Sequence, residues 1–94
     1  MAMYPLSILD DNTQIMYSNL QEIDGLKSVI IHFERPTEEG FDSIRCKLPN
    51  YEWTIWEGSY TDEEMEIFEN MVRGGAHIFY ELAEMGGYEF ANVV

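Results

Sequence analysis

The spacing of apolar residues along the chain changes character once, near Gly58. Before that point, apolar and polar residues alternate with a period of two in three segments, 26–34, 41–48 and 51–57. After it, apolar residues recur with the period of a helix. Three consecutive strands joined by short loops predict an antiparallel β-meander, and the last segment predicts a helix packed against it.

Turn residues separate the three predicted strands. Asp24-Gly25 is typical of a tight turn before the first of them. The sequence RPTEEG should close that strand, with Pro36 and Gly40 in the turn.

Two stretches nearer the N-terminus, 3–9 and 13–20, predict a further hairpin around the sequence Asp-Asp-Asn. Pro5 lacks a backbone N–H, so the first strand of this hairpin is expected at an edge of the sheet.

A single helix is predicted over residues 62–85. Thr61 and Glu64 have the spacing of an N-terminal capping box, and a glycine pair after the last apolar residue predicts the helix end. The apolar residues stay in phase across Gly74 and Gly75, which favours one helix over two. Gly75 falls within the apolar arc, where we expect it to let the helix axis approach the sheet. The arc comprises Met65, Phe68, Met71, Val72, Ile78, Phe79, Leu82 and Ala83.

These elements predict one small α+β domain over residues 1–94. It is an antiparallel β-meander of three to five strands with one long C-terminal amphipathic helix packed on one face. A composition that is 46% hydrophobic and 14% aromatic is typical of a folded chain rather than a disordered one. The final segment, YEFANVV, is expected to form a short strand or a tail packed on the core.

The charge of the chain limits the partners that it can have. Eighteen acids and five Lys or Arg residues give a formal net charge of −13. Residues 1–47 hold eight acids and four cations (−4), whereas residues 48–94 hold ten acids and one cation (−9). A phosphate backbone requires a cationic surface, so direct binding of nucleic acid is not expected. Anionic membranes are disfavoured for the same reason.

The only cysteine, Cys46, excludes an internal disulfide. The sequence shows no signal-peptide pattern and no apolar run long enough to cross a membrane. We therefore expect a cytoplasmic protein.

No residue pattern predicts catalysis, a metal site or a cofactor. Cys46 shares a strand face with Ile44 and Leu48, which predicts a buried, inert thiol. His77 and Glu81 have the i,i+4 spacing of metal ligands, but a surface ion pair is the simpler interpretation because no third ligand is evident. His32 is expected on the solvent face of its strand.

The polar face of the helix is the first candidate for an interaction surface. Acids in the first turn interact favourably with the helix dipole, and Glu69 with Arg73 forms an ordinary i,i+4 pair. A merely solvated face is therefore one interpretation. The excess of acids continues beyond the first turn, which favours the other interpretation, contact with a basic protein. The residues predicted to bind such a partner are Asp62, Glu63, Glu66, Glu69, Glu81 and Glu84.

The uncovered face of the sheet is the second candidate. One helix covers one face, so Ile30 and Trp56 are expected to form an apolar patch on the other unless the N-terminal hairpin or the tail covers them. A homodimer or a larger complex could form through this patch.

The sequence thus predicts a non-enzymatic acidic binding protein that docks on a basic protein surface. In size and charge it is similar to small acidic inhibitors and nucleic-acid mimics, such as phage anti-defence proteins and antitoxins. That similarity is one of composition and not of motif. The alternative is a homo-oligomeric or complex-subunit domain that associates through its uncovered sheet face.

Overall fold

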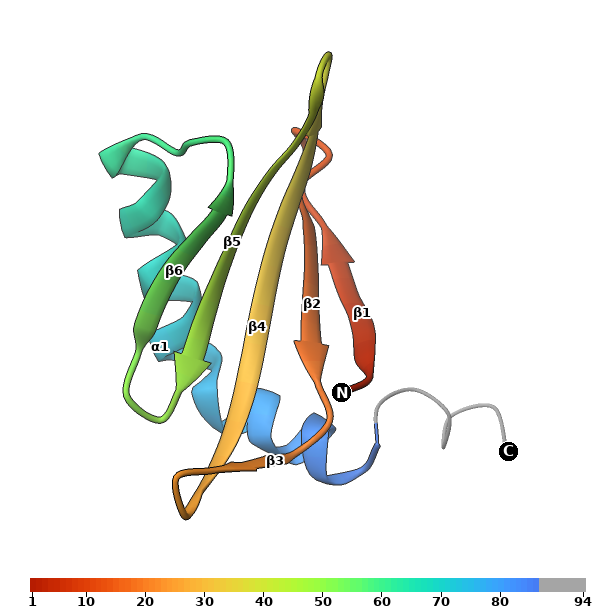
Figure 1. Cartoon of the computed structure of the whole chain (residues 1–94), viewed down its shortest axis with the longest axis vertical. Coiled ribbons are helices and arrows are strands. Elements are labelled where there is room, and N and C mark those ends of the chain that lie inside the picture. Colours follow the sequence, from red (N-terminus) through yellow and green to blue (C-terminus); the bar gives the residue numbers. More distant parts are fainter. Residues whose placement is uncertain (87–94) are drawn as a thin grey trace.

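The computed structural model describes residues 1–86, and these form one antiparallel sheet with one helix packed on it (Figure 1). The elements are β1 (Met3–Ile8), β2 (Gln14–Ser18), β3 (Gln21–Ile23), β4 (Leu26–Thr37), β5 (Gly40–Leu48), β6 (Glu52–Glu57) and α1 (Asp62–Glu84). The strand order is β1-β2-β4-β5-β6, and β3 pairs with the start of β4. The predicted α+β architecture is confirmed. The short strand β3 was not predicted, because three residues are too few to show a period.

The N-terminal hairpin and the Asp-Gly turn follow the sequence predictions. β1 pairs with β2 at one edge of the sheet, so Pro5 lies on an edge strand. Asp24 and Gly25 both have positive φ, 52° and 78°, as the tight turn between β3 and β4 requires. The hairpin extends the sheet and does not cover its open face.

The prediction that Pro36 lies in a turn is wrong. β4 continues through Pro36, and the turn consists of Glu38 and Glu39 between the paired residues Thr37 and Gly40. β2 pairs with β4 only as far as Glu34, so Pro36 has a strand neighbour on one side alone. A residue without an N–H is tolerated at such a position.

The hydrophobic core lies between α1 and one face of the sheet. The central strands β4 and β5 contribute fully buried residues, and the helix contributes Phe68, Val72, Phe79 and Ala83. Phe68 stacks on Phe33 with the ring centroids 4.3 Å apart. Cys46 is buried in this core, as predicted.

The boundaries of α1 agree with the prediction to within one residue. Thr61 and Glu64 form the reciprocal capping box, and Gly86 follows the last turn with a φ of +75°. The interpretation of Gly75 is wrong. A Cβ atom there would meet only the Phe79 ring, at 3.6 Å, so Gly75 does not bring the helix axis close to the sheet. The predicted C-terminal strand or tail lies outside the described residues.

Candidate interaction surface

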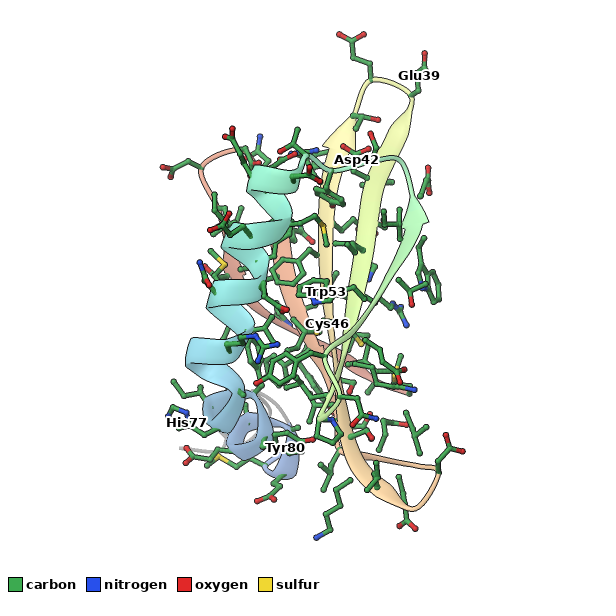
Figure 2. The ribbon with its side chains drawn as sticks, turned by 90° about the vertical axis from the view of Figure 1, so that its left-hand side faces the viewer. Glu39, Asp42, Cys46, Trp53, His77 and Tyr80 are labelled. Carbon is green, nitrogen blue, oxygen red and sulfur yellow. The ribbon has the colours of Figure 1, made fainter. Side chains whose placement is uncertain are left out.

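Three turns and the start of α1 meet at one end of the molecule (Figure 1). They are the β1–β2 turn, the β4–β5 turn and the β6–α1 connection, and Figure 2 labels Glu39 and Asp42 at this end. We call it the acidic end, because its side chains include nine carboxylates with Arg35 as their cation. The nine are Asp10, Asp11, Glu38, Glu39, Asp42, Glu57, Asp62, Glu63 and Glu64.

Arg35 organises the base of the acidic end. Its guanidinium donates from Nε and Nη2 to Oδ2 of Asp42, at 3.1 and 2.7 Å. Nη1 donates to Oε2 of Glu64, and also lies 3.5 Å from Oδ2 of Asp11. Nη2 reaches the carbonyl of Ser59 at 3.4 Å. One side chain thereby joins β4, β5, the first helical turn and two connecting loops.

The ring of Tyr60 lies under this cluster and closes the core. The Arg35 guanidinium carbon is 4.8 Å from the ring centroid, and the Tyr60 hydroxyl donates to the Asp42 carbonyl at 2.7 Å. Burial raises the pKa of Tyr60 to about 12.

The ion cluster keeps its carboxylates ionised. The hydrogen bonds from Arg35 lower the pKa of Asp42 below its ordinary value of 3.8. The pKa of Glu64 lies below its ordinary value of 4.5 because Glu64 accepts the Thr61 backbone N–H and also binds Arg35. Glu64 therefore serves the cap, as the sequence predicted, and also holds an ion pair that the sequence did not reveal.

Six carboxylates of the acidic end remain without a cation. None of the six forms an ion pair with a described residue, and all are exposed to solvent. They are Asp10, Glu38, Glu39, Glu57, Asp62 and Glu63. Arg35 offsets one of the three negative charges at the base of this surface, and the rim has no cation among the described residues.

The residues predicted to bind a partner do not form one compact patch. Asp62, Glu63 and Glu66 are exposed in the first two turns of α1, at or next to the acidic end. Glu81 and Glu84 are exposed near the other end of the helix. No carboxylate lies between Glu69 and Glu81, a gap of about 18 Å at 1.5 Å per residue.

Glu69 differs from the other predicted residues because it is half-buried and already bonded. Its Oε2 accepts the indole N–H of Trp53 at 3.0 Å, and its Oε1 lies 3.4 Å from Nη2 of Arg73. The i,i+4 pair is confirmed. The bond from Trp53 ties α1 to the edge strand β6, so Glu69 has a structural role.

The open face of the sheet carries Trp56 on its surface. The Trp56 side chain is 62% exposed, and the guanidinium carbon of Arg45 lies 3.9 Å from its ring centroid. Half-buried Ile30 lines the same shallow depression of about 170 Å³. Lys47 and Glu52 pair beside it at 2.9 Å, so this face carries both signs of charge.

His32 lies on this open face, but the prediction that it is a surface histidine is wrong. The residue is only 6% exposed. It occupies the central strand, where Met16 and Arg45 flank it from the neighbouring strands. Arg45 Nε donates to His32 Nδ1 at 3.1 Å, and His32 Nε2 lies 3.2 Å from Oε1 of Glu34. Long neighbouring side chains bury it without a second layer of structure.

The remaining candidates do not form a chemical site. Burial raises the pKa of the Cys46 thiol to about 12, so it is neutral near pH 7. His77 and Glu81 are exposed, and the predicted ion pair between them does not form. Residues 1–86 contain no cluster of three His, Cys, Asp or Glu side chains that could hold a metal ion. No helix within them could span a membrane.

Six carboxylates of the acidic end lie outside the helix and were missed by reasoning on the helix alone. They are Asp10, Asp11, Glu38, Glu39, Asp42 and Glu57. A signal for them exists in the sequence. In an antiparallel meander, alternate turns lie at the same end of the sheet, and these acids lie in or beside such turns.

The chain was also compared with known proteins. No family model, curated protein or solved structure matches it, so the geometry of its surfaces is the basis for assigning a function.

Proposed function

We propose that this protein is a non-enzymatic inhibitor or regulator that docks through its acidic end on a basic protein surface. A nucleic-acid-binding groove is the most suitable target, because its cations are arranged to receive a row of anions. The mode of action would resemble that of phage anti-defence proteins and antitoxins. The single cysteine favours a cytoplasmic setting.

One observation supports this proposal above the others: six exposed carboxylates share one end of the fold and have no cation of their own. An ordinary solvated surface intersperses charges of both signs. Here the repulsion among the six lowers the stability of the free protein, and a cationic partner would relieve it. The helix dipole stabilises Asp62 and Glu63 in the first turn of α1. It does not stabilise Glu38 and Glu39, which lie on a hairpin tip.

Reversing the charge of the hairpin tip tests the proposal. Glu38→Lys/Glu39→Lys changes the charge of the acidic end by four units at exposed side chains outside the core. In affinity capture from native lysate, we expect the wild-type chain to retain basic proteins at low salt and release them at high salt. The double variant should bind a captured protein at least about tenfold more weakly.

The matched control is Glu81→Lys/Glu84→Lys. It makes the same change in charge at two exposed positions near the other end of α1. Binding should survive it at low salt. If the two double variants weaken binding equally, net charge is responsible and the acidic end is not the site. Binding that is insensitive to salt would reject the proposal outright.

The open sheet face supports a second candidate function, self-association or membership of a complex. Trp56 is a large aromatic ring held flat against Arg45 and exposed to solvent. Aromatic and Arg side chains are enriched at protein interfaces. This face carries cations beside its acids, so two chains of charge −13 would repel each other least if they met here.

Analytical ultracentrifugation of the wild-type chain and of Trp56→Ser tests this second candidate. We expect a dimer that dissociates in the variant, with at least about a tenfold rise in the dimer dissociation constant. A wild-type chain that remains a monomer at about 1 mM, a concentration that reveals associations of only about 4 kcal/mol, would exclude a homodimer.

A further inference from the structure

A groove runs between β1 and α1 on the helix side of the sheet. The helix lies over β2 and β4, and it crosses the sheet obliquely, so the edge strand β1 is left partly uncovered (Figure 1). Two depressions of about 420 and 270 Å³ lie along this line, and Leu9 lines both. Their lining is mainly aliphatic and aromatic.

Apolar side chains line the groove from both sides. Half-buried Leu6 and Leu9 line it from β1 and the turn that follows, whereas Ile67 and Ile78 on α1 are 53% and 46% exposed. The sequence placed Ile78 in the apolar arc of the helix, and this arc extends past the sheet into the groove. Exposed isoleucines along one side of an apolar groove are typical of an interface.

The middle of the groove contains glycine where the fold itself does not require it. Gly75 lines the smaller depression, and a Cβ there would make only an ordinary contact with Phe79. At Gly74 a Cβ would meet nothing within 4 Å. Glycine inside a helix is less favourable than alanine, and its usual advantage is close approach of another chain to the backbone. Gly75 keeps the helix wall open at this point.

The charge at one end of the groove selects among possible occupants. Asp10, Asp11 and Glu64 line the larger depression, which opens onto the acidic end. Arg35, which pairs with Asp11 and Glu64, supplies one positive charge against their three negative ones. A second copy of this chain would bring its own charge of −13 to these acids. Residues 87–94 include one carboxylate and no cation, so they do not complement them either. A cationic segment does.

We propose that this groove receives an amphipathic, cationic segment of the protein partner, a proposal that rests on the function proposed above. Aliphatic side chains of the segment insert between Leu9, Ile67 and Ile78. Lys or Arg residues at one of its ends contact Asp10 and Asp11. The apolar contacts add affinity that salt does not screen, and the acidic end sets the direction in which the segment lies.

Two synthetic peptides separate the groove from the acidic end. One is an amphipathic helix of about 18 Leu and Lys residues, long enough to follow the helix wall. The other is an oligolysine of equal charge, which has no apolar face. Fluorescence anisotropy of labelled peptides would measure both affinities for the full chain. We expect the Leu/Lys peptide to bind at least about tenfold more tightly than oligolysine, and to keep most of that advantage at high salt.

Ile67→Ser/Ile78→Ser removes the apolar wall at two exposed positions. It should weaken the Leu/Lys peptide about tenfold or more and leave oligolysine unchanged. Ile55→Ser is the matched control, because Ile55 is 55% exposed on β6, at the opposite edge of the sheet from β1. Circular dichroism would verify that all variants are folded.

The outcomes distinguish the two proposals. If Ile67→Ser/Ile78→Ser and Ile55→Ser bind the Leu/Lys peptide equally well, the groove is not the site. The proposal that the acidic end binds a basic partner would still be supported if Glu38→Lys/Glu39→Lys weakens the binding of both peptides. If a Leu/Glu peptide binds as tightly as the Leu/Lys peptide, the occupant is not cationic.

Two further results would assign the groove to another occupant and overturn the proposal. Methyl NMR contacts from Ile67 or Ile78 to Tyr88 or Phe90 in the free protein would identify the chain's own C-terminal segment. A dimer that dissociates only in Ile67→Ser/Ile78→Ser would identify a second copy.

Discussion

Replacing Arg35 by methionine should lower the free energy of unfolding by about 2–4 kcal/mol. The guanidinium binds Asp42 and Glu64, and all three side chains are largely shielded from water. Methionine retains much of the volume but leaves two half-buried carboxylates close together without a cation. Removing one partner of such a cluster costs more than the pair contributes, because the remaining charges stay desolvated. Urea unfolding followed by Trp fluorescence would measure the loss.

Arg73→Met is the matched control. Arg73 pairs with Glu69 and lies over the Tyr51 ring, but its side chain is mostly exposed. A surface pair of this kind contributes less than about 1 kcal/mol. Equal losses in the two variants would show that Arg35 has no special role.

The effect of Arg35 should also depend on pH in one direction. The pKa values of Asp42 and Glu64 are lowered in the folded state, so their contribution is complete above the ordinary values of 3.8 and 4.5. It is lost as the pH falls through the lowered values. The stability difference between wild type and Arg35→Met should be constant from about pH 7 to 5 and shrink below about pH 4. A difference that is independent of pH would contradict the ionic explanation.

Phe68→Ala should be the most destabilising single change, costing about 3–5 kcal/mol. The ring is buried, stacked on Phe33 at 4.3 Å and in edge contact with Tyr60 at 5.4 Å. Truncation leaves a cavity where the helix, β4 and the base of the acidic end meet, and the surrounding elements can only partly collapse into it. The midpoint of urea unfolding should fall without a change in its slope.

The neighbouring residue supplies the control for this prediction. Ile67→Ala removes an aliphatic side chain one position earlier, where it is exposed, and should change stability by no more than about 0.5 kcal/mol. A comparable loss in both variants would mean that helix propensity, and not the cavity, sets the effect.

Features governed by local rules could be predicted from the sequence. The capping box, the Asp24-Gly25 turn and the change from a period of two to a helical period each depend on residues a few positions apart. They predicted α1 to within one residue and the order of all described elements except β3. The burial of Cys46 also followed, because alternation placed it with Ile44 and Leu48.

Features that depend on neighbouring strands could not be predicted from the sequence. Alternation assigns His32 to a face, but Met16 and Arg45 on adjacent strands decide that it is buried. Pro36 was predicted to lie in a turn because the sequence does not show that β2 ends before reaching it. That early end leaves Pro36 unpaired on one side, where a strand tolerates proline. The role of Gly75 depends on where the helix crosses the sheet. The spacing of residues within the helix does not determine that position.

The same distinction applies to the candidate site. The sequence by itself determined that the chain carries −13, with its acids near turns and in the first helical turn. Only the tertiary structure decided which carboxylates are neighbours. Antiparallel pairing brings alternate turns to one end of the sheet, and Arg35 then binds Asp42 and Glu64 there. Five Lys and Arg residues cannot pair with eighteen acids, so composition leaves most acids without a cation, and folding decides that the rim of the acidic end is where six of them gather.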